Sequence, residues 1–257
     1  MSIAASSGEF QAIMSTAAIA HNLQRVRQRI AVAAQAAGRD PATVTLLAVS
    51  KTFGAEAVLA AAAAGQRDFG ENYAQEGIVK MAQVREAAPA LALRWHFIGP
   101  IQSNKTRPIA EHYDAVQSVD RLKIAQRLAE QRPAHLPPLD VLVQINVSGE
   151  ASKSGAPPAE AEALARAVAA LPGLRLRGLM AIPAPTDDDQ LARQPFAQMR
   201  ALFDRLRAAG LPLDILSMGM SGDIEAAVAE GATMLRVGTA IFGARRAPPV
   251  RGEEHQP

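Results

Sequence analysis

The stretch TLLAVSKTFG, residues 45–54, is a short apolar run that ends in a lysine. Residues 46–49 are all apolar and include a β-branched valine, a pattern typical of a strand buried on both faces. Lysine is rare in this chain, because only five of its 27 basic side chains are lysines and the rest are arginines. Arginine therefore supplies most of the positive charge, and the position of Lys51 directly after a buried strand needs an explanation.

Similar apolar runs recur along the chain, with Ala-, Leu- and Arg-rich segments of helical spacing between them. The eight expected strands are TLLAVS (45–50), RDFGEN (67–72), RWHFIG (94–99), AVQSVD (115–120), DVLVQINV (140–147), RLRGLMAI (175–182), LDILSMG (213–219) and MLRVGTAI (234–241), and helices are expected at 19–38, 158–173 and 195–210. Consecutive runs lie about 20–30 residues apart, the length of a strand–helix unit. Eight such units, with one extra helix in front, predict an α/β protein built as a single (β/α)₈ (TIM) barrel. A doubly wound open sheet is the alternative.

No linker rich in proline, glycine or serine divides the chain, so we expect one barrel domain over residues 17–243. Residues 1–16 are expected to form a flexible N-terminal extension. Residues 244–257, ARRAPPVRGEEHQP, are expected to form a polar C-terminal tail.

Composition excludes several classes of function. The chain has no cysteine, which excludes disulfides, thiolate catalysis and cysteine-ligated metals, and we expect no metal site. The net charge is only +2 and no basic block is present, so we expect no nucleic-acid partner. No apolar run approaches the roughly 20 residues that span a membrane, and the start MSIAASSGEF lacks the features of a signal peptide. We therefore expect a soluble, cytoplasmic protein that does not associate with membranes.

Polar residues gather at the expected strand ends, where the active sites of such barrels are built. Two turns rich in small residues, SMGMSGD (217–223) and RVGTAIFG (236–243), follow the seventh and eighth strands, where barrels most often bind phosphate. Small residues let backbone N–H groups approach an anion, and hydroxyls add donors. Ser221 is expected to cap a helix near 223–230 and to contact the phosphate. The alternative for each turn is ordinary strand-to-helix turn chemistry.

Lys51 gains significance from this expected phosphate site. A lysine partly removed from water is a better nucleophile and can form a Schiff base with an aldehyde, although it can also simply extend from a strand end to solvent. Arg236 lies inside an apolar strand and needs either a structural carboxylate or a ligand acceptor. His96, between two aromatic residues, is more simply interpreted as a satisfied core histidine than as a catalytic one. Asn72 either caps a turn or contacts a ligand.

Several strand-end motifs together resemble a known family. In chain order they are AVSKT, FGENY, WHFIGPIQSNK, INVSGEASKSG, RGLMAI, LSMGMSGD and RVGTAIFG. Over residues 17–243 they resemble the YggS/PROSC family of pyridoxal phosphate homeostasis proteins, with Ile101 standing where that family usually has leucine. The resemblance implies a barrel of the alanine racemase N-terminal-domain type and pyridoxal 5′-phosphate (PLP) as cofactor.

The resemblance also implies roles for individual residues. It assigns Lys51 to the Schiff base, Ser217, Ser221, Gly238 and Thr239 to the phosphate, Arg236 to the pyridine nitrogen, Asn72, His96 and Met180 to the pocket wall, and Lys153 to a secondary contact with the cofactor. An always-protonated arginine at the pyridine nitrogen weakens the ring as an electron sink. Racemases on this barrel also use a tyrosine as a second base, together with an added β-domain across a dimer. Here we expect Tyr73 and Tyr113 to be structural.

We therefore expect a protein that holds PLP reversibly on Lys51 and takes part in intracellular PLP homeostasis without strong turnover. Apo forms of PLP-dependent enzymes are the expected recipients, and we expect a monomer. The alternative is a weak PLP-dependent amino-acid racemase. A class I aldolase is a more distant alternative, for which Glu71 is the only candidate acid–base carboxylate.

Overall fold

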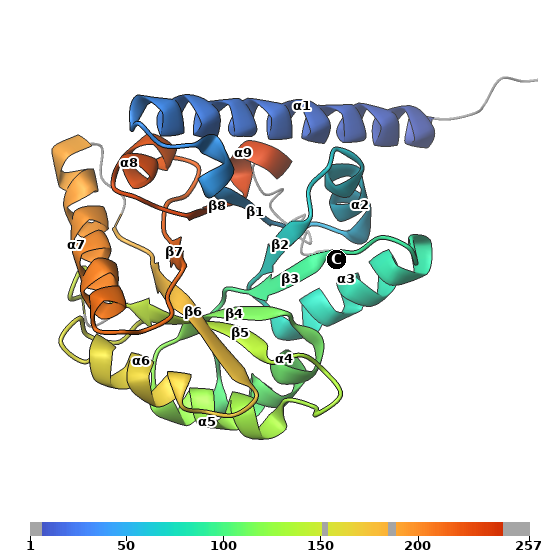
Figure 1. The fold of residues 1–257 in the computed structure, drawn as a ribbon. Coiled ribbons are helices and arrows are strands. Elements are labelled where there is room, and N and C mark those ends of the chain that lie inside the picture. The colour runs from blue at the N-terminus through green and yellow to red at the C-terminus, as the bar shows by residue number, and fades with distance from the viewer. Residues whose placement is uncertain (1–6, 151–153, 185–188, 244–257) are drawn as a thin grey trace, which may run out of the picture.

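Eight parallel strands close into a barrel in the order in which they occur along the chain. This computed structural model describes residues 7–150, 154–184 and 189–243 (Figure 1). The strands are β1 Thr45–Val49, β2 Asp68–Glu71, β3 Arg94–Phe97, β4 Ala115–Val119, β5 Leu139–Ile145, β6 Leu174–Ala181, β7 Ile215–Ser217 and β8 Met234–Val237. The predicted barrel is confirmed, and the open sheet is wrong because β1 pairs with both β2 and β8.

Helices follow the strands and form the outer layer of the barrel (Figure 1). They are α1 Ser7–Ala36, α2 Ala55–Ala63, α3 Ala74–Ala87, α4 Thr106–His112, α5 Leu122–Gln131, α6 Ala161–Ala169, α7 Asp189–Ala208, α8 Ile224–Ala229 and α9 Thr239–Phe242, with 3₁₀ turns η1 Pro41–Thr43 and η2 Ser103–Lys105. Within the described residues, no helix combines the length and the apolar character that crossing a membrane requires.

Several expected boundaries differ from the observed ones. The strand expected over 234–241 ends at Val237, because Gly238 leaves the sheet and α9 begins at Thr239. The strand expected over 213–219 is shortened to Ile215–Ser217. Helix α1 begins at Ser7 and therefore includes residues 7–16 of the expected N-terminal extension. Residues 1–6 and the expected polar tail, 244–257, lie outside the described residues.

Helix α1 packs across the outside of the barrel against α2, α8 and α9 (Figure 1). Leu23, Val26, Ile30 and Ala34 are buried, and their spacing of three to four residues places them on one face of the helix. The Asn22 side-chain amide also donates a hydrogen bond to the carbonyl of Ile241, at 3.0 Å. The helix that precedes the barrel therefore supports the segment that follows β8.

Candidate functional site

A cavity of about 360 Å³ opens at the carboxyl ends of β1, β2 and β8. Its lining residues are Val49, Lys51, Thr52, Phe53, Asn72, Ile98, Ile182, Met220, Ser221, Gly222, Arg236, Gly238, Thr239 and Gly243. Six residues singled out from the sequence lie together here: Lys51, Asn72, Ser221, Arg236, Gly238 and Thr239. The volume falls in the range of small-molecule sites, and the lining combines apolar walls with a few polar groups, as such sites do.

Ser221 and Thr239 lie beside each other on the two turns that follow β7 and β8. The Thr239 hydroxyl donates to Ser221 Oγ at 3.2 Å, and the backbone N–H of Ala240 donates to the same oxygen at 3.4 Å. Gly238 brings its turn against β1, since a Cβ there would lie 3.2 Å from the carbonyl oxygen of Val49. Two hydroxyls and a glycine turn therefore meet at one edge of the cavity, an arrangement suited to an anion.

Ser221 is not the helix cap expected from the sequence. The N-cap residue of α8 is Asp223, whose carboxylate accepts a hydrogen bond from the backbone N–H of Met220 at 2.5 Å. The turn after β7 thus closes on Asp223, and the Ser221 hydroxyl faces the first residues of α9 instead.

Arg236 lines the cavity although it is only 4% exposed. Its Nη1 donates to Ser217 Oγ at 2.9 Å, and its Nη2 donates to the carbonyl of Ala181 at 2.8 Å. Burial lowers the pKa of Arg236 to about 10, an effect that the negative charge of Asp223 opposes. The guanidinium is therefore still charged at neutral pH. Its two described partners are a hydroxyl and a carbonyl rather than a carboxylate.

Below Arg236, a chain of hydrogen bonds crosses the inside of the barrel. The Ser217 hydroxyl donates to Gln117 Oε1 at 2.7 Å, and Gln117 Nε2 lies 3.0 Å from His96 Nδ1. His96 Nε2 in turn lies 3.2 Å from Asp68 Oδ1. The Gln117 amide is a donor, so Nδ1 is the accepting nitrogen of His96 and Nε2 is the one that faces the Asp68 carboxylate. We call Arg236, Ser217, Gln117, His96 and Asp68 the interior chain.

Three residues expected at the cofactor pocket lie beneath the cavity rather than in its lining. His96 and Ser217 belong to the interior chain, and Met180 on β6 is fully buried. The structure places His96 inside the barrel, where its two ring nitrogens face Gln117 and Asp68. This matches the core-histidine interpretation. Lys153, to which the resemblance gave a secondary role, lies outside the described residues.

Lys51 follows β1 and is half-buried, between a fully buried Ser50 and an exposed Thr52. Thr52 has a backbone φ of +67°, the left-handed conformation that non-glycine residues rarely adopt. Asn72 reaches the cavity from the end of β2, where Gly99 permits close packing, since a Cβ there would lie 2.1 Å from the carbonyl oxygen of Asn72. The turn after β1 therefore places Lys51 in the lining of the cavity.

Neither tyrosine lines the cavity. Tyr113 is buried against Phe97, with ring centroids 5.4 Å apart, and its hydroxyl donates to the carbonyl of Ala74 at 3.4 Å. Burial raises the pKa of Tyr113, so its hydroxyl stays protonated. Tyr73 is 55% exposed at the start of α3. Glu71, the carboxylate on which an aldolase would depend, is fully buried and also lies outside the lining.

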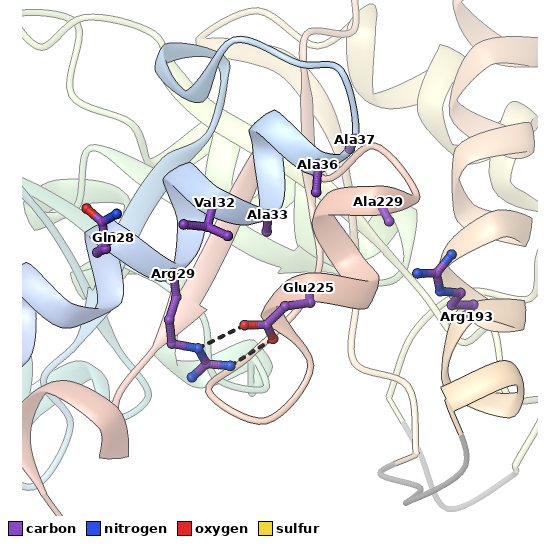
Figure 2. Close-up of a pocket in the computed structure, with 9 residues that line it drawn as sticks. All are labelled: Gln28, Arg29, Val32, Ala33, Ala36, Ala37, Arg193, Glu225 and Ala229. Atoms are coloured by element: carbon purple, nitrogen blue, oxygen red, sulfur yellow. Dashed lines mark hydrogen bonds and ion pairs between the residues drawn. The ribbon is translucent and has the colours of Figure 1, made fainter.

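A second groove, of about 560 Å³, lies outside the barrel between α1 and α8 (Figure 2). Four of its nine lining residues are alanines, and two others, Arg29 and Glu225, form an ion pair at 2.8 Å. Arg29 Nη1 also donates to the carbonyl of Ser221 at 3.1 Å. The groove therefore adjoins the turn that carries Ser221, and Lys51 is not among its lining residues.

Comparison with known proteins agrees with this geometry. Residues 14–246 match the family model "Alanine racemase, N-terminal domain". The pyridoxal phosphate homeostasis protein of Pseudomonas aeruginosa is 64% identical, over 90% of this chain and 97% of its own length. Its namesake in Escherichia coli K12 is 56% identical, over 88% of this chain and 97% of its own length.

A solved structure of PipY from Synechococcus elongatus, described as having PLP bound, superposes with a TM-score of 0.76. It is 37% identical, and the match covers 88% of this chain and all of PipY. The shared barrel, the matched length and the identity to these relatives lead to one assignment: the chain belongs to the family of pyridoxal phosphate homeostasis proteins, on the barrel of the alanine racemase N-terminal domain.

Proposed function

We propose that this protein binds PLP in the cavity at the strand ends, holds it through a Schiff base on Lys51, and takes part in PLP homeostasis without strong catalytic turnover. The observation that carries the proposal is the joint presence of Lys51, Arg236 and the Ser221–Thr239 pair in one cavity of about 360 Å³. The printed names of the relatives and the PLP-bound PipY structure support the choice of ligand.

The lining meets the three chemical requirements of this cofactor. Ser221 and Thr239 offer hydroxyls, and Gly238 a close backbone approach, to the phosphate. Arg236 offers guanidinium N–H groups to the pyridine nitrogen, which is an acceptor. Lys51 offers a primary amine to the aldehyde. When bound, PLP supplies an electrophilic carbonyl carbon and an electron-withdrawing ring.

Lys51 performs the only covalent step. Its amine adds to the aldehyde carbon, a C=N bond replaces C=O, and the oxygen leaves as water with both amine hydrogens. No oxidant or reductant is needed, and water reverses the step. Reversible attachment suits a protein that stores a reactive aldehyde and releases it, and we propose that apo forms of PLP-dependent enzymes receive it from a monomeric donor.

Two features of the lining argue against efficient racemisation. Arg236 stays protonated and donates toward the ring nitrogen, so it disfavours the protonated ring that stabilises a carbanion. Among the described lining residues, Lys51 and Arg236 are the only titratable ones, so no second base faces Lys51 across the cavity. A weak racemase using Lys51 as its single base is the alternative.

The proposal is tested by treating the protein, saturated with PLP, with borohydride and mapping the modified peptide. We expect a yellow protein whose colour is lost on reduction, with the stable adduct on Lys51. A protein that stays colourless after PLP is added would refute both the binding role and the racemase. Formation of D-alanine from L-alanine at ordinary enzymatic rates would favour the racemase instead.

Replacing Thr239 with valine is expected to weaken PLP binding by about tenfold to a hundredfold, because a hydrogen bond to a charged group contributes about 1.5–3 kcal/mol. The measurement is a fluorescence or absorbance titration with PLP. Pyridoxal, which lacks the phosphate, serves as the matched control ligand, and its affinity should change by less than about threefold. Equal losses for both ligands would show that Thr239 does not contact the phosphate.

A further inference from the structure

Lys80, on helix α3, is only 3% exposed. Lysine is almost never this deeply buried unless its charge is paired, because removing an ammonium from water is costly. No sequence motif singled out this residue, and it does not line the cavity that holds Lys51. Its burial therefore calls for an explanation from its partners.

The Lys80 ammonium has three described acceptors. Its Nζ donates to the carbonyl oxygen of Ser50 at 2.8 Å, to Glu71 Oε1 at 2.7 Å and to Glu76 Oε1 at 3.3 Å. An ammonium carries three N–H donors, so these contacts match its full capacity. One of the three acceptors is the backbone of the residue directly before Lys51.

Both carboxylates that pair with Lys80 also hold the chain around Lys51. Glu71 Oε1 accepts a hydrogen bond from the Ser50 hydroxyl at 2.6 Å. Glu76 Oε1 accepts a hydrogen bond from the backbone N–H of Thr52 at 2.7 Å. The residue before Lys51 and the residue after it are therefore fixed by one cluster, in which Lys80 and Glu71 are buried and Glu76 is partly exposed.

Thr52 is in the left-handed conformation, which non-glycine residues rarely adopt. A strained backbone conformation of this kind persists only where contacts with the surrounding structure hold it in place, and such conformations are concentrated at functional sites. The bond from Thr52 N–H to Glu76 is such a constraint. Glu71 is fully buried, and its Oε2 has no described partner. Its hydrogen bonds with Ser50 and with Lys80 are both made by Oε1.

We propose that Lys80, Glu71 and Glu76 form a positioning cluster, the Lys80 clamp, which fixes the backbone of residues 50–52 so that the Lys51 amine is directed into the cavity. The three residues act through the backbone and none of them touches the cofactor. The inference rests on the proposed role of Lys51. Fixing a nucleophile in advance matters because misplacing a reacting group by about 1 Å can cost a hundredfold in rate.

The test compares Glu76→Ala with Glu76→Gln. Glutamine keeps an oxygen at the same place and can still accept from Thr52 N–H and Lys80, whereas alanine removes both contacts. Glu76 is partly exposed, with 37% of its side chain accessible, so neither change should unfold the protein. Glu86→Ala, at an exposed position on the same helix, controls for general effects on α3.

Two quantities are measured on each variant. The first is amide hydrogen exchange at Thr52 in protein without added PLP, and the second is the rate at which a borohydride-trappable adduct forms on Lys51. We expect Glu76→Ala to speed exchange at Thr52 and to slow adduct formation by about tenfold to a hundredfold. Glu76→Gln and Glu86→Ala should stay within about threefold of the original protein in both quantities.

An unchanged Thr52 exchange rate and an unchanged adduct rate in Glu76→Ala would overturn the clamp. Equal losses in Glu76→Ala and Glu76→Gln would also overturn it, because the charge rather than the contact would then be responsible. If the original protein itself forms no adduct on Lys51, the proposed function fails, and the exchange measurement still reports on the clamp alone.

Discussion

Replacing Lys51 with alanine is expected to eliminate the borohydride-reducible adduct with PLP while leaving the protein folded. Lys51 is the only lysine among the described residues that line the cavity. Of the other described lysines, Lys80 is buried in the clamp, whereas Lys105 and Lys123 are exposed and do not line the cavity. No described side chain is therefore placed to take over the Schiff base.

The measurement for this variant is mass spectrometry of the intact protein after reduction, with circular dichroism as the check on folding. Lys51 is half-buried at a strand end, so the free energy of unfolding should change by no more than about 1 kcal/mol. PLP should still bind without a covalent bond, through Arg236 and the Ser221–Thr239 pair, and should be lost on dialysis. Lys123→Ala is the matched control, and a full adduct in Lys51→Ala would disprove the assignment.

Replacing Gln117 with leucine is expected to lower the free energy of unfolding by about 2–4 kcal/mol. The leucine fills a similar volume but leaves the Ser217 hydroxyl and His96 Nδ1 without their described partner, and each unsatisfied buried group costs about 1–3 kcal/mol. Ser217 also loses the acceptor for its proton, so Arg236 is held less firmly and PLP affinity should fall as well.

Urea unfolding measures the change in stability, and Gln83→Leu on the exposed face of α3 is the control, with an expected change within about 0.5 kcal/mol. The double variant Gln117→Leu/Ser217→Ala should be less destabilised than the sum of the single variants, since the two residues share one hydrogen bond. If Gln117→Leu lowered the free energy of unfolding by less than about 1 kcal/mol, the hydrogen bonds of the Gln117 amide would not be what stabilises the interior chain.

Much of the fold and part of the site could be predicted from the sequence. The order of the apolar runs and their spacing predicted the barrel, because each strand–helix unit has its own local pattern. Lys51 and Arg236 were found because a rare lysine and an arginine in an apolar strand stand out locally. The lining shows that both belong to one cavity.

Other features depend on contacts that local patterns do not encode. Strands buried on both faces have apolar residues at nearly every position, so the sequence did not reveal that His96 points into the barrel toward Gln117 and Asp68. Ser221 resembled a helix cap, yet the turn closes on Asp223 two residues later. Lys80 was missed because two of its acceptors, Ser50 and Glu71, lie thirty and nine residues away along the chain.

The interior chain also has a consequence for how the strands align. Its members come from five strands: Asp68 from β2, His96 from β3, Gln117 from β4, Ser217 from β7 and Arg236 from β8. Sliding any of these strands by one residue would turn its polar side chain out of the barrel and leave its neighbours unpaired. The residues beneath the cavity therefore favour one strand register over the others. This register fixes the relative positions of the two turns that follow β7 and β8.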